Sequence, residues 1–335
     1  MHSIVEMYRV ILTSTIIGFF ATLFMTRKWI GKATQHGLLG FDMNKPSRPL
    51  VAEMGGIAVV FGFLMGLLYY IGISTFYFHS TDYNVILACT CTILIMTIIG
   101  MMDDVLGWKK GISQWKKPIL TIPAAMPIMV INAGQSSMDL WFIGNVDWGI
   151  IYPLVIIPIG IMGASNAYNM LAGYNGLEAG MGVIILSTLG YIAYLGNETE
   201  TVVLAICMVG ALVAFLWFNW YPARVFPGDT LTYSVGALVA CIAIIGNMEK
   251  IATILFVPYF LDFLLVLRSR FKAEAFGKVR LDGSLDKPYD EIYHMTHLAI
   301  FVLNKVKRNV YEREVVFFIY GVELIFVGLV WAIYL

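Results

Sequence analysis

Apolar stretches long enough to cross a membrane recur along the chain, and shorter segments rich in polar residues separate them. A helix of roughly 17–25 apolar residues crosses a bilayer core about 30 Å thick. The fourth stretch contains Pro118, Pro123 and Pro127, which a membrane helix tolerates where neighbours satisfy the freed carbonyl groups. The pattern predicts ten spans, over residues 5–26, 54–74, 85–102, 118–134, 149–165, 177–195, 201–218, 229–247, 251–268 and 314–335.

We therefore expect an all-α, polytopic membrane protein that forms a single integral-membrane domain over residues 1–335. Residues 269–312 are the only sizeable segment outside the predicted spans. Asp282-Gly283-Ser284 predicts a turn in this segment, and a helix is expected from Tyr293 to Val306. No internal repeat is evident.

Composition agrees with this class. Of the 335 residues, 59% are hydrophobic and 13% are charged, whereas about 25% of a typical soluble protein is charged. The formal net charge is zero, so nothing indicates a nucleic-acid partner. The four cysteines are interpreted as small apolar residues, without a disulfide framework or zinc-site spacing, because they lie inside apolar runs: Cys89, Cys91, Cys207 and Cys241. The first run is interpreted as a span and not a cleaved signal.

The distribution of lysine and arginine predicts the orientation. Of the 22 basic residues, 20 lie after the first, third, seventh and ninth predicted spans. Only Lys250 lies on the other side, and Arg9 is near the N-terminus. Because cytoplasmic loops carry the excess of positive charge, the loops after the odd-numbered spans should be cytoplasmic and both termini should face outward.

The dense polar segments lie on the same side as the basic residues. The connections on the opposite side contain acids and asparagines but no comparable clusters of Gly, Asn and Asp. Two independent patterns thus predict one composite site at the cytoplasmic surface. Its segments are residues 40–56, 101–117, 163–180, 218–236 and 269–312.

The residue types in these segments indicate phosphate chemistry. Carboxylate and amide oxygens are ligands that suit Mg²⁺ or Mn²⁺, and lysine and arginine bind phosphate. Glycine-rich segments let backbone N–H groups approach an anion closely. Together they favour metal-assisted phosphoryl transfer.

Structural roles remain open for several of these residues. Asp103 and Asp104 could cap an interfacial helix or pair with Lys109 and Lys110. Asp229 follows Pro-Gly at a good N-cap position for the next helix.

The other polar residues also have structural alternatives. Asn169 and Asn175 flank Gly173 and could serve a turn only. A lining role and direct catalysis are both open for Asp262, and an interfacial role is favoured over a metal pair for His294 and His297.

At this point the chain resembles the polyprenyl-phosphate N-acetylhexosamine-1-phosphate transferase family. The motifs that carry the resemblance are "FDMNKPSRPLVAEMGG", "GMMDDVLGW", "NAYNMLAGYNGLEAG" and "PARVFPGDT". The third motif, and the segment from "MTHLAIFVLNK" through "YEREVVFF", look most like the dolichyl-phosphate GlcNAc-1-phosphotransferase branch. The short chain suggests an archaeal member in the cell membrane, whereas a eukaryotic one would lie in the endoplasmic reticulum.

The resemblance implies ten spans, a cytoplasmic site, and transfer of GlcNAc-1-phosphate from UDP-GlcNAc to dolichyl phosphate with release of UMP. It implies a Mg²⁺ cofactor, with Mn²⁺ as an alternative, and leaves a homodimer open. The implied metal ligands are Asn169 and Asp229, and the implied catalytic residues are Asp103, Asp104 and Lys117. The implied substrate-binding residues are Asp42, Asn44, Lys45, Glu53, Gly173, Asn175, Gly176 and Glu178.

The last polar segment departs from the family pattern. Family members carry a histidine-rich or Arg/His-rich run there, whereas this chain has "RFKAEAFGKVRLDGS". Lys278 and Arg280 are the expected sugar-phosphate contacts. Because this loop is expected to recognise the sugar, another UDP-sugar such as UDP-MurNAc-pentapeptide remains an alternative. A cation-coupled transporter is the alternative from another class, with intramembrane acids as its ion sites.

Overall fold

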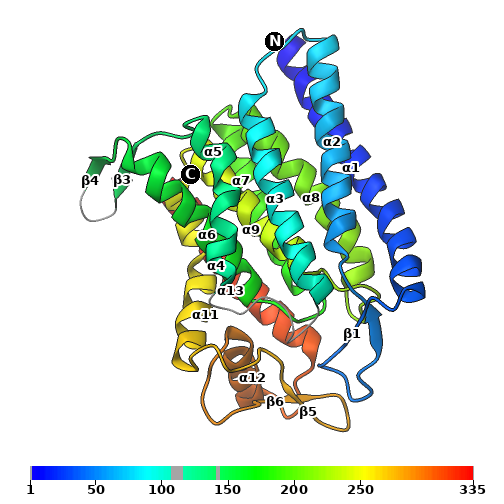
Figure 1. The fold of residues 1–335 in the computed structure, drawn as a ribbon. Helices are drawn as coiled ribbons and strands as arrows, with labels where there is room; N and C mark the ends of the chain where they lie inside the picture. Colours follow the sequence, from blue (N-terminus) through cyan, green and yellow to red (C-terminus); the bar gives the residue numbers. More distant parts are fainter. Residues whose placement is uncertain (1, 107–115, 141–143, 335) are drawn as a thin grey trace.

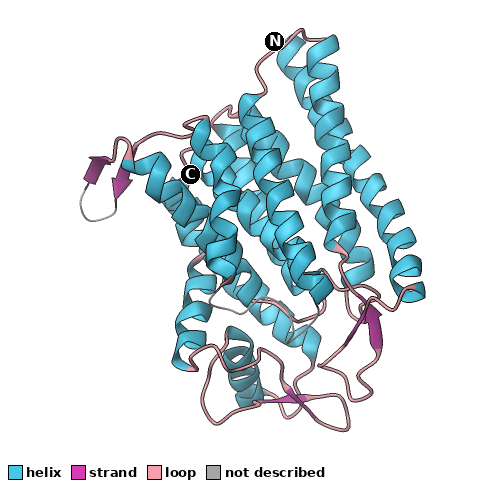
Figure 2. Ribbon diagram, in the orientation of Figure 1, coloured by secondary structure: helices cyan, strands magenta, loops and turns pink. Residues whose placement is uncertain are grey.

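The computed structural model describes residues 2–106, 116–140 and 144–334, which form a bundle of helices with three short hairpins (Figures 1 and 2). Both chain ends lie away from the loops at the bottom of Figure 1. The helices are α1 (His2–Gln35), α2 (Gly56–Phe76), α3 (Asn84–Leu106), α4 (Lys117–Thr121), the 3-10 helix η1 (Ile122–Ala125), α5 (Met126–Val130), the π-helix η2 (Tyr152–Ile156), α6 (Ile157–Met170), α7 (Leu177–Leu195), α8 (Thr199–Asn219), α9 (Gly228–Ile245), α10 (Glu249–Leu255), α11 (Val257–Arg268), α12 (Met295–Val306) and α13 (Glu312–Tyr334).

Seven of the described helices are long and apolar enough to cross a membrane, namely α1, α2, α3, α7, α8, α9 and α13. Helices α10 and α11 are bent by 57° and make an eighth span if they are counted together. The protein is thus an integral membrane protein, but the predicted count of ten spans is not confirmed.

Prolines explain the difference in the middle of the chain. The predicted fourth span is divided into α4, η1 and α5, each with a proline in its first turn. The predicted fifth span begins as η2, which contains Pro153, and continues as α6. Proline lacks the N–H donor that continues a helix, so these segments are short or irregular.

Helix α9 lies at the centre of the bundle and packs against α2, α3, α6, α7 and α8. Two glycines allow this close packing. A Cβ atom on Gly100 of α3 would lie 2.5 Å from the Asp229 carbonyl oxygen, and one on Gly236 of α9 would lie 2.7 Å from the Ser165 Cα of α6. The beginning of α9 is thereby held directly against the end of α3.

Two of the three hairpins lie among the loops at the bottom of Figure 1, and the third lies toward the other end. The turn predicted at Asp282–Ser284 is confirmed, because the Asp282 carboxylate accepts bonds from the backbone N–H and the hydroxyl of Ser284. The expected helix after it is confirmed as α12. The antiparallel pairs are β1 (Leu39–Phe41) with β2 (Leu50–Ala52), β3 (Ser137–Leu140) with β4 (Gly144–Asp147), and β5 (Lys278–Val279) with β6 (Leu285–Asp286).

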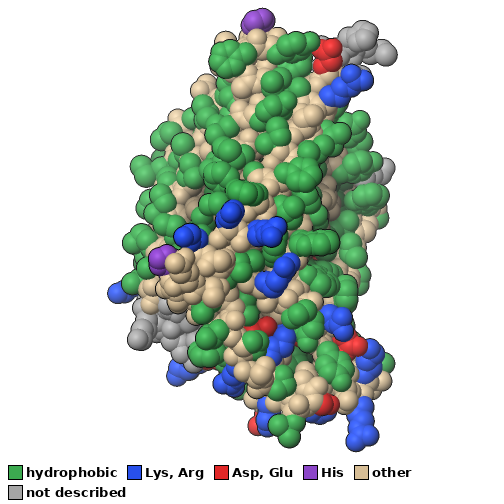
Figure 3. All heavy atoms as spheres, turned by 90° about the vertical axis from the view of Figure 1, so that its right-hand side faces the viewer, with side chains coloured by type: hydrophobic (Ala, Val, Ile, Leu, Met, Phe, Trp, Pro, Cys, Tyr) green, Lys and Arg blue, Asp and Glu red, His purple; other side chains and the backbone are tan. Residues whose placement is uncertain are grey.

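The surface agrees with a membrane location. In Figure 3 hydrophobic side chains cover most of the upper part of the visible face, and charged side chains gather toward the end that carries β5 and β6. This apolar cover includes large exposed side chains such as Leu12, Phe20 and Phe24 of α1. An apolar surface of this extent is expected of a protein whose solvent is lipid.

Candidate active site

Lys117 is the centre of a charged group at the loop end of the bundle. It is the first residue of α4, and its Nζ atom lies 2.6 Å from Asp103 Oδ2 and 2.8 Å from Asp229 Oδ2. Asp103 is near the end of α3 and Asp229 is in the first turn of α9. Residues from three helices and two of the polar segments, 101–117 and 218–236, therefore meet on one ammonium group.

Asp104 points to a different partner. Its Oδ1 atom accepts the backbone N–H of Asp229 at 2.7 Å, and its Oδ2 atom accepts the backbone N–H and the hydroxyl of Thr230 at 3.0 and 2.6 Å. Asp104 therefore caps α9 from another helix and places a negative charge at the positive end of its dipole. Asp229 is the second residue of α9 and not its N-cap, which is Pro227, and its carboxylate accepts a hydrogen bond from Lys117.

Gly228 makes this cap possible. Its φ is +71°, a left-handed conformation that favours glycine, and a Cβ atom there would lie 2.5 Å from the Asp104 carboxylate. Both the backbone conformation and the close packing against Asp104 therefore favour glycine at this position of the "FPGDT" motif.

The first polar loop is bonded to the loop that precedes α9. The backbone N–H groups of Gly55 and Gly56 donate to the carbonyl oxygens of Phe226 and Pro227, each at 2.8 Å. Burial and the nearby Asp104 charge raise the pKa of the Glu53 carboxyl, which lies in the same loop. Glu53 therefore belongs to the surroundings of the Lys117 group.

Four residues from three of the polar segments form a closed ring of polar contacts. The Asp42 carboxylate accepts the Asn175 side-chain N–H and lies 3.0 Å from Lys45 Nζ. Lys45 also pairs with Glu312, and Glu312 Oε1 accepts the backbone N–H of Asn175 at 2.8 Å. The four are named the Glu312 ring below, and they join the first polar loop, residues 171–176 and the start of α13.

Residues 171–176 form a glycine-rich loop with further supports. Gly173 and Gly176 have φ values of +100° and +87°, so the turn uses the glycines and not the flanking asparagines. Glu178 Oε1 accepts the Gly173 N–H at 2.7 Å, and Asn44 Nδ2 donates to the Gly173 carbonyl at 3.3 Å. The loop is thus held by side chains from both directions.

The last polar segment meets this loop through Phe276 and Gly277. A Cβ atom on Gly173 would lie 3.0 Å from the Phe276 ring, and the Gly277 N–H donates to Asn44 Oδ1 at 3.2 Å. Arg280 lies in the hairpin and makes a bidentate pair with Asp286, with both contacts at 2.6 Å.

The histidines expected at the interface are held by protein groups. His294 Nδ1 lies 3.2 Å from the buried Asp262, which also accepts the Met295 N–H. Burial, and then the neighbouring His294, lower the pKa of His297 to about 4. A neutral His297 whose Nε2 contacts the Glu274 carbonyl serves to fold the segment.

The two residues that the resemblance implies as metal ligands, Asn169 and Asp229, lie close to Lys117. The Tyr233 ring is 5.9 Å from Lys117 Nζ, and its hydroxyl lies next to the Asn169 side chain, so Asn169 and Asp229 face the same region. Over residues 2–106, 116–140 and 144–334, no three His, Cys, Asp or Glu side chains are arranged to hold a metal. Mg²⁺ is usually held by one or two carboxylates together with water and substrate phosphates. One carboxylate and one amide therefore fit an ion that binds with its substrate.

The sequence missed some residues that the structure brings to the site, chiefly Thr230, Glu312 and Tyr320. The Tyr320 hydroxyl donates to the Gly176 carbonyl at 2.5 Å. The available signal for Glu312 was an acid two residues before the last predicted span. Lys109 and Lys110, considered as partners of the aspartate pair, lie outside the described residues.

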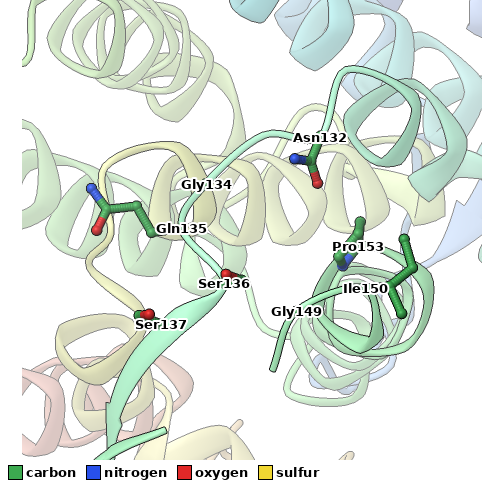
Figure 4. Close-up of a pocket in the computed structure, with 8 residues that line it drawn as sticks. All are labelled: Asn132, Gly134, Gln135, Ser136, Ser137, Gly149, Ile150 and Pro153. Carbon is green, nitrogen blue, oxygen red and sulfur yellow. The ribbon is translucent and has the colours of Figure 1, made fainter. Parts of the chain in front are cut away.

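A separate hollow of about 500 Å³ lies beside β3, toward the other end of the bundle (Figure 4). Its lining has no acid and no base, so it lacks the groups needed for phosphate chemistry. The lining residues are Asn132, Gly134, Gln135, Ser136, Ser137, Gly149, Ile150 and Pro153.

Known proteins resemble this chain over most of its length. The model of glycosyl transferase family 4 matches residues 85–247. A putative UDP-N-acetylglucosamine–dolichyl-phosphate N-acetylglucosaminephosphotransferase of Saccharolobus solfataricus is 36% identical over 324 residues, which cover 94% of each chain. The UDP-N-acetylglucosamine–dolichyl-phosphate N-acetylglucosaminephosphotransferase of Dictyostelium discoideum is 28% identical, over 69% of this chain and 65% of the Dictyostelium chain. A phospho-N-acetylmuramoyl-pentapeptide-transferase of Streptococcus thermophilus is 31% identical over 75% of this chain and 74% of its own.

Proposed function

The chain belongs to glycosyl transferase family 4, and on that premise we propose that it transfers N-acetylglucosamine 1-phosphate from UDP-N-acetylglucosamine to dolichyl phosphate. The observation that carries this proposal is Lys117 held between Asp103 and Asp229 where the polar loops meet. A lysine ammonium binds phosphate, and the carboxylates beside it suit a cation that accompanies a pyrophosphate. The relatives with N-acetylglucosamine in their names favour that sugar.

The reaction is a direct displacement. An oxygen of the lipid phosphate attacks the β-phosphorus of the UDP-sugar, the bond from that phosphorus to the bridging oxygen breaks, and UMP leaves with the electron pair. The products are UMP and the sugar joined to the lipid through a diphosphate. A phosphate monoester has a second pKa near 6, so the lipid phosphate is largely dianionic at neutral pH and needs no strong base.

Each residue of the Lys117 group has a separate role in the proposed reaction. Lys117 neutralises negative charge on the pyrophosphate, and Asp103 orients the Lys117 ammonium toward it. Asp104 keeps the first turn of α9 in place, so that Asp229 stays directed into the site. Asp229 and Asn169 would hold Mg²⁺, which supplies charge neutralisation at the transferred phosphate.

The nucleotide is assigned to the glycine-rich loop. Asn175 and Glu178 lie at the uridine, with the Gly173 and Gly176 backbone close by. Asn44, Lys45 and the 269–312 segment adjoin the loop. The basic residues at this end favour a cytoplasmic site with both termini outside.

UMP release from the purified protein tests the proposal. The assay contains dolichyl phosphate, Mg²⁺ and a panel of UDP-sugars that includes UDP-N-acetylglucosamine and UDP-MurNAc-pentapeptide. We expect UMP only when both lipid phosphate and Mg²⁺ are present, and fastest with UDP-N-acetylglucosamine. Faster release from UDP-MurNAc-pentapeptide would favour the reaction of the streptococcal relative.

Two other results would overturn the mechanism or the class. A phosphorylated protein trapped with UDP-sugar alone, before lipid is added, would replace direct displacement by a covalent intermediate. No UMP from any sugar, together with solute uptake by proteoliposomes, would identify a transporter.

A further inference from the structure

Glu312 is a buried acid to which the sequence gives no role. It is the first residue of α13 and only 2% of it is exposed. One carboxylate oxygen pairs with Lys45, and the other accepts the Asn175 N–H at 2.8 Å. These partners lie 267 and 137 positions away in the sequence. A single carboxylate therefore fixes two loops relative to the last helix.

Each buried charge of the Glu312 ring has an oppositely charged or hydrogen-bonding partner within the ring. Lys45 lies between two carboxylates, and Asn175 donates to both through its backbone and its side chain. Removing one member of such a buried set costs more than the pair contributes, because it leaves another charge without its partner. The ring is thus a rigid support, and its removal is felt by both loops.

The ring also sets the direction of the Asn175 amide. An ionised carboxylate only accepts hydrogen bonds, so Asp42 requires the nitrogen end of the amide to face it. The oxygen end then faces away from Asp42 as an acceptor. Helix α13 supports the same loop a second time, through the Tyr320 hydroxyl on the Gly176 carbonyl.

We propose that Glu312 is a positioning residue that holds the glycine-rich loop 171–176, and with it Lys45, in the geometry that binds the nucleotide sugar. This inference rests on the proposed function for the identity of the ligand. It does not place Glu312 in contact with substrate, and it predicts a loss of nucleotide-sugar affinity before a loss of turnover.

Glu314 provides a matched control. It lies two residues along the same helix, and it pairs with the exposed Lys307 and accepts the Tyr311 N–H. The experiment compares Glu312→Gln and Glu312→Ala with Glu314→Gln and Glu314→Ala in the full-length protein. Steady-state UMP release gives KM and kcat, and hydrogen–deuterium exchange reports the backbone of residues 171–176.

We expect Glu312→Ala to raise the KM for UDP-N-acetylglucosamine by about tenfold or more, as losing a charged hydrogen bond does, with kcat changed by less than about threefold. Glu312→Gln keeps one acceptor and should have a smaller effect. Exchange at residues 171–176 should rise in both variants, and the Glu314 variants should match the wild type. The KM for dolichyl phosphate should stay unchanged.

Equal KM and exchange in the Glu312 and Glu314 variants would overturn the inference. A fall in kcat alone, without a change in KM or in exchange, would also overturn it. If the wild type releases no UMP, the proposed function fails. Faster exchange at residues 171–176 in Glu312→Gln, and not in Glu314→Gln, would still support the positioning role. Glu312→Gln also keeps the test valid if Glu312→Ala does not fold.

Discussion

The two charged clusters at the loop end of the bundle are built in opposite ways. In the Lys117 group one ammonium faces Asp103 and Asp229, and the Asp229 side chain is 23% exposed. In the Glu312 ring the Glu312 and Asp42 side chains are only 2% and 5% exposed. The first cluster is therefore the more open one, through Asp229, and the second is the more closed one, since both of its carboxylates are buried.

The charge balance separates the clusters as well. The Lys117 ammonium contacts two carboxylates, and with Asp104, which bonds to the first turn of α9, the group has three carboxylates for one lysine, a formal charge of −2. A pyrophosphate would be repelled by this excess unless a cation accompanied it, which is why we propose that Mg²⁺ binds with the substrate. The Glu312 ring has two carboxylates for one lysine, a formal charge of −1, and two N–H groups of Asn175 donate to those carboxylates. The larger excess of negative charge lies in the cluster that we propose for the chemistry, and the smaller excess lies in the cluster that we propose for positioning.

Replacing Asp229 should give the largest effect. We expect Asp229→Asn to lower kcat by about 10²–10³-fold, the usual loss when a preorganised electrostatic group is removed, because it removes the proposed metal ligand and the charged partner of Lys117 together. The measurement is UMP release at saturating UDP-sugar over a range of Mg²⁺ concentrations. Asp147→Asn is the control, since Asp147 lies in the β3–β4 hairpin and contacts Ser136 and Gly149. A wild-type rate for Asp229→Asn would remove Asp229 from the chemistry.

Of the two adjacent aspartates, we expect Asp103 to affect mainly activity and Asp104 to affect mainly stability. We expect Asp103→Asn to lower kcat by about tenfold or more without loss of UDP-sugar binding, because it removes one charge beside Lys117. Asp104→Ala should instead lower the free energy of unfolding by about 1–2 kcal/mol, since it removes the cap of α9. Thermal unfolding and nucleotide binding measured on both variants separate the two roles. The reverse assignment would place Asp104 at the substrate and make Asp103 the structural residue.

The residues of the open cluster were predictable from the sequence, and the contacts that form the closed ring were not. The resemblance implied Asp42, Lys45 and Asn175 as substrate-binding residues, but nothing indicated that they meet Glu312. Asp103, Lys117 and Asp229 stand at the ends of apolar runs, where a charge is conspicuous, and the basic residues indicate which ends share a surface. Which aspartate faces Lys117 was not predictable, because neighbouring residues on a helix point about 100° apart and their partners lie on other helices. Asp104 could not be recognised as a cap, since it caps a helix 125 positions later.

The same limit applies to the fold. The long spans follow from hydropathy alone, and their positions agree with the predicted ranges. The first was predicted to end at residue 26, but α1 continues to Gln35. Its last turns carry Arg27, Lys28 and Lys32, and a helix can pass from lipid into water without any change of backbone hydrogen bonding. Hydropathy therefore marks where the lipid ends, and not where the helix ends.

Replacing Arg280 should have the smallest effect on activity, and it tests whether the β5–β6 hairpin is part of the substrate site. The sequence placed it with Lys278 as a sugar-phosphate contact, whereas its guanidinium is paired with Asp286 on the surface of the β5–β6 hairpin. Exposed ion pairs contribute little, so Arg280→Ala should leave kcat and KM within about twofold of the wild type. Asp286→Asn is the matched variant, because it removes the partner and frees the guanidinium without removing it. If Arg280→Ala raises the KM for the UDP-sugar about tenfold while Asp286→Asn does not, the guanidinium leaves Asp286 to bind the substrate. The hairpin would then be a third, movable part of the site, beside the open group around Lys117 and the closed ring around Glu312.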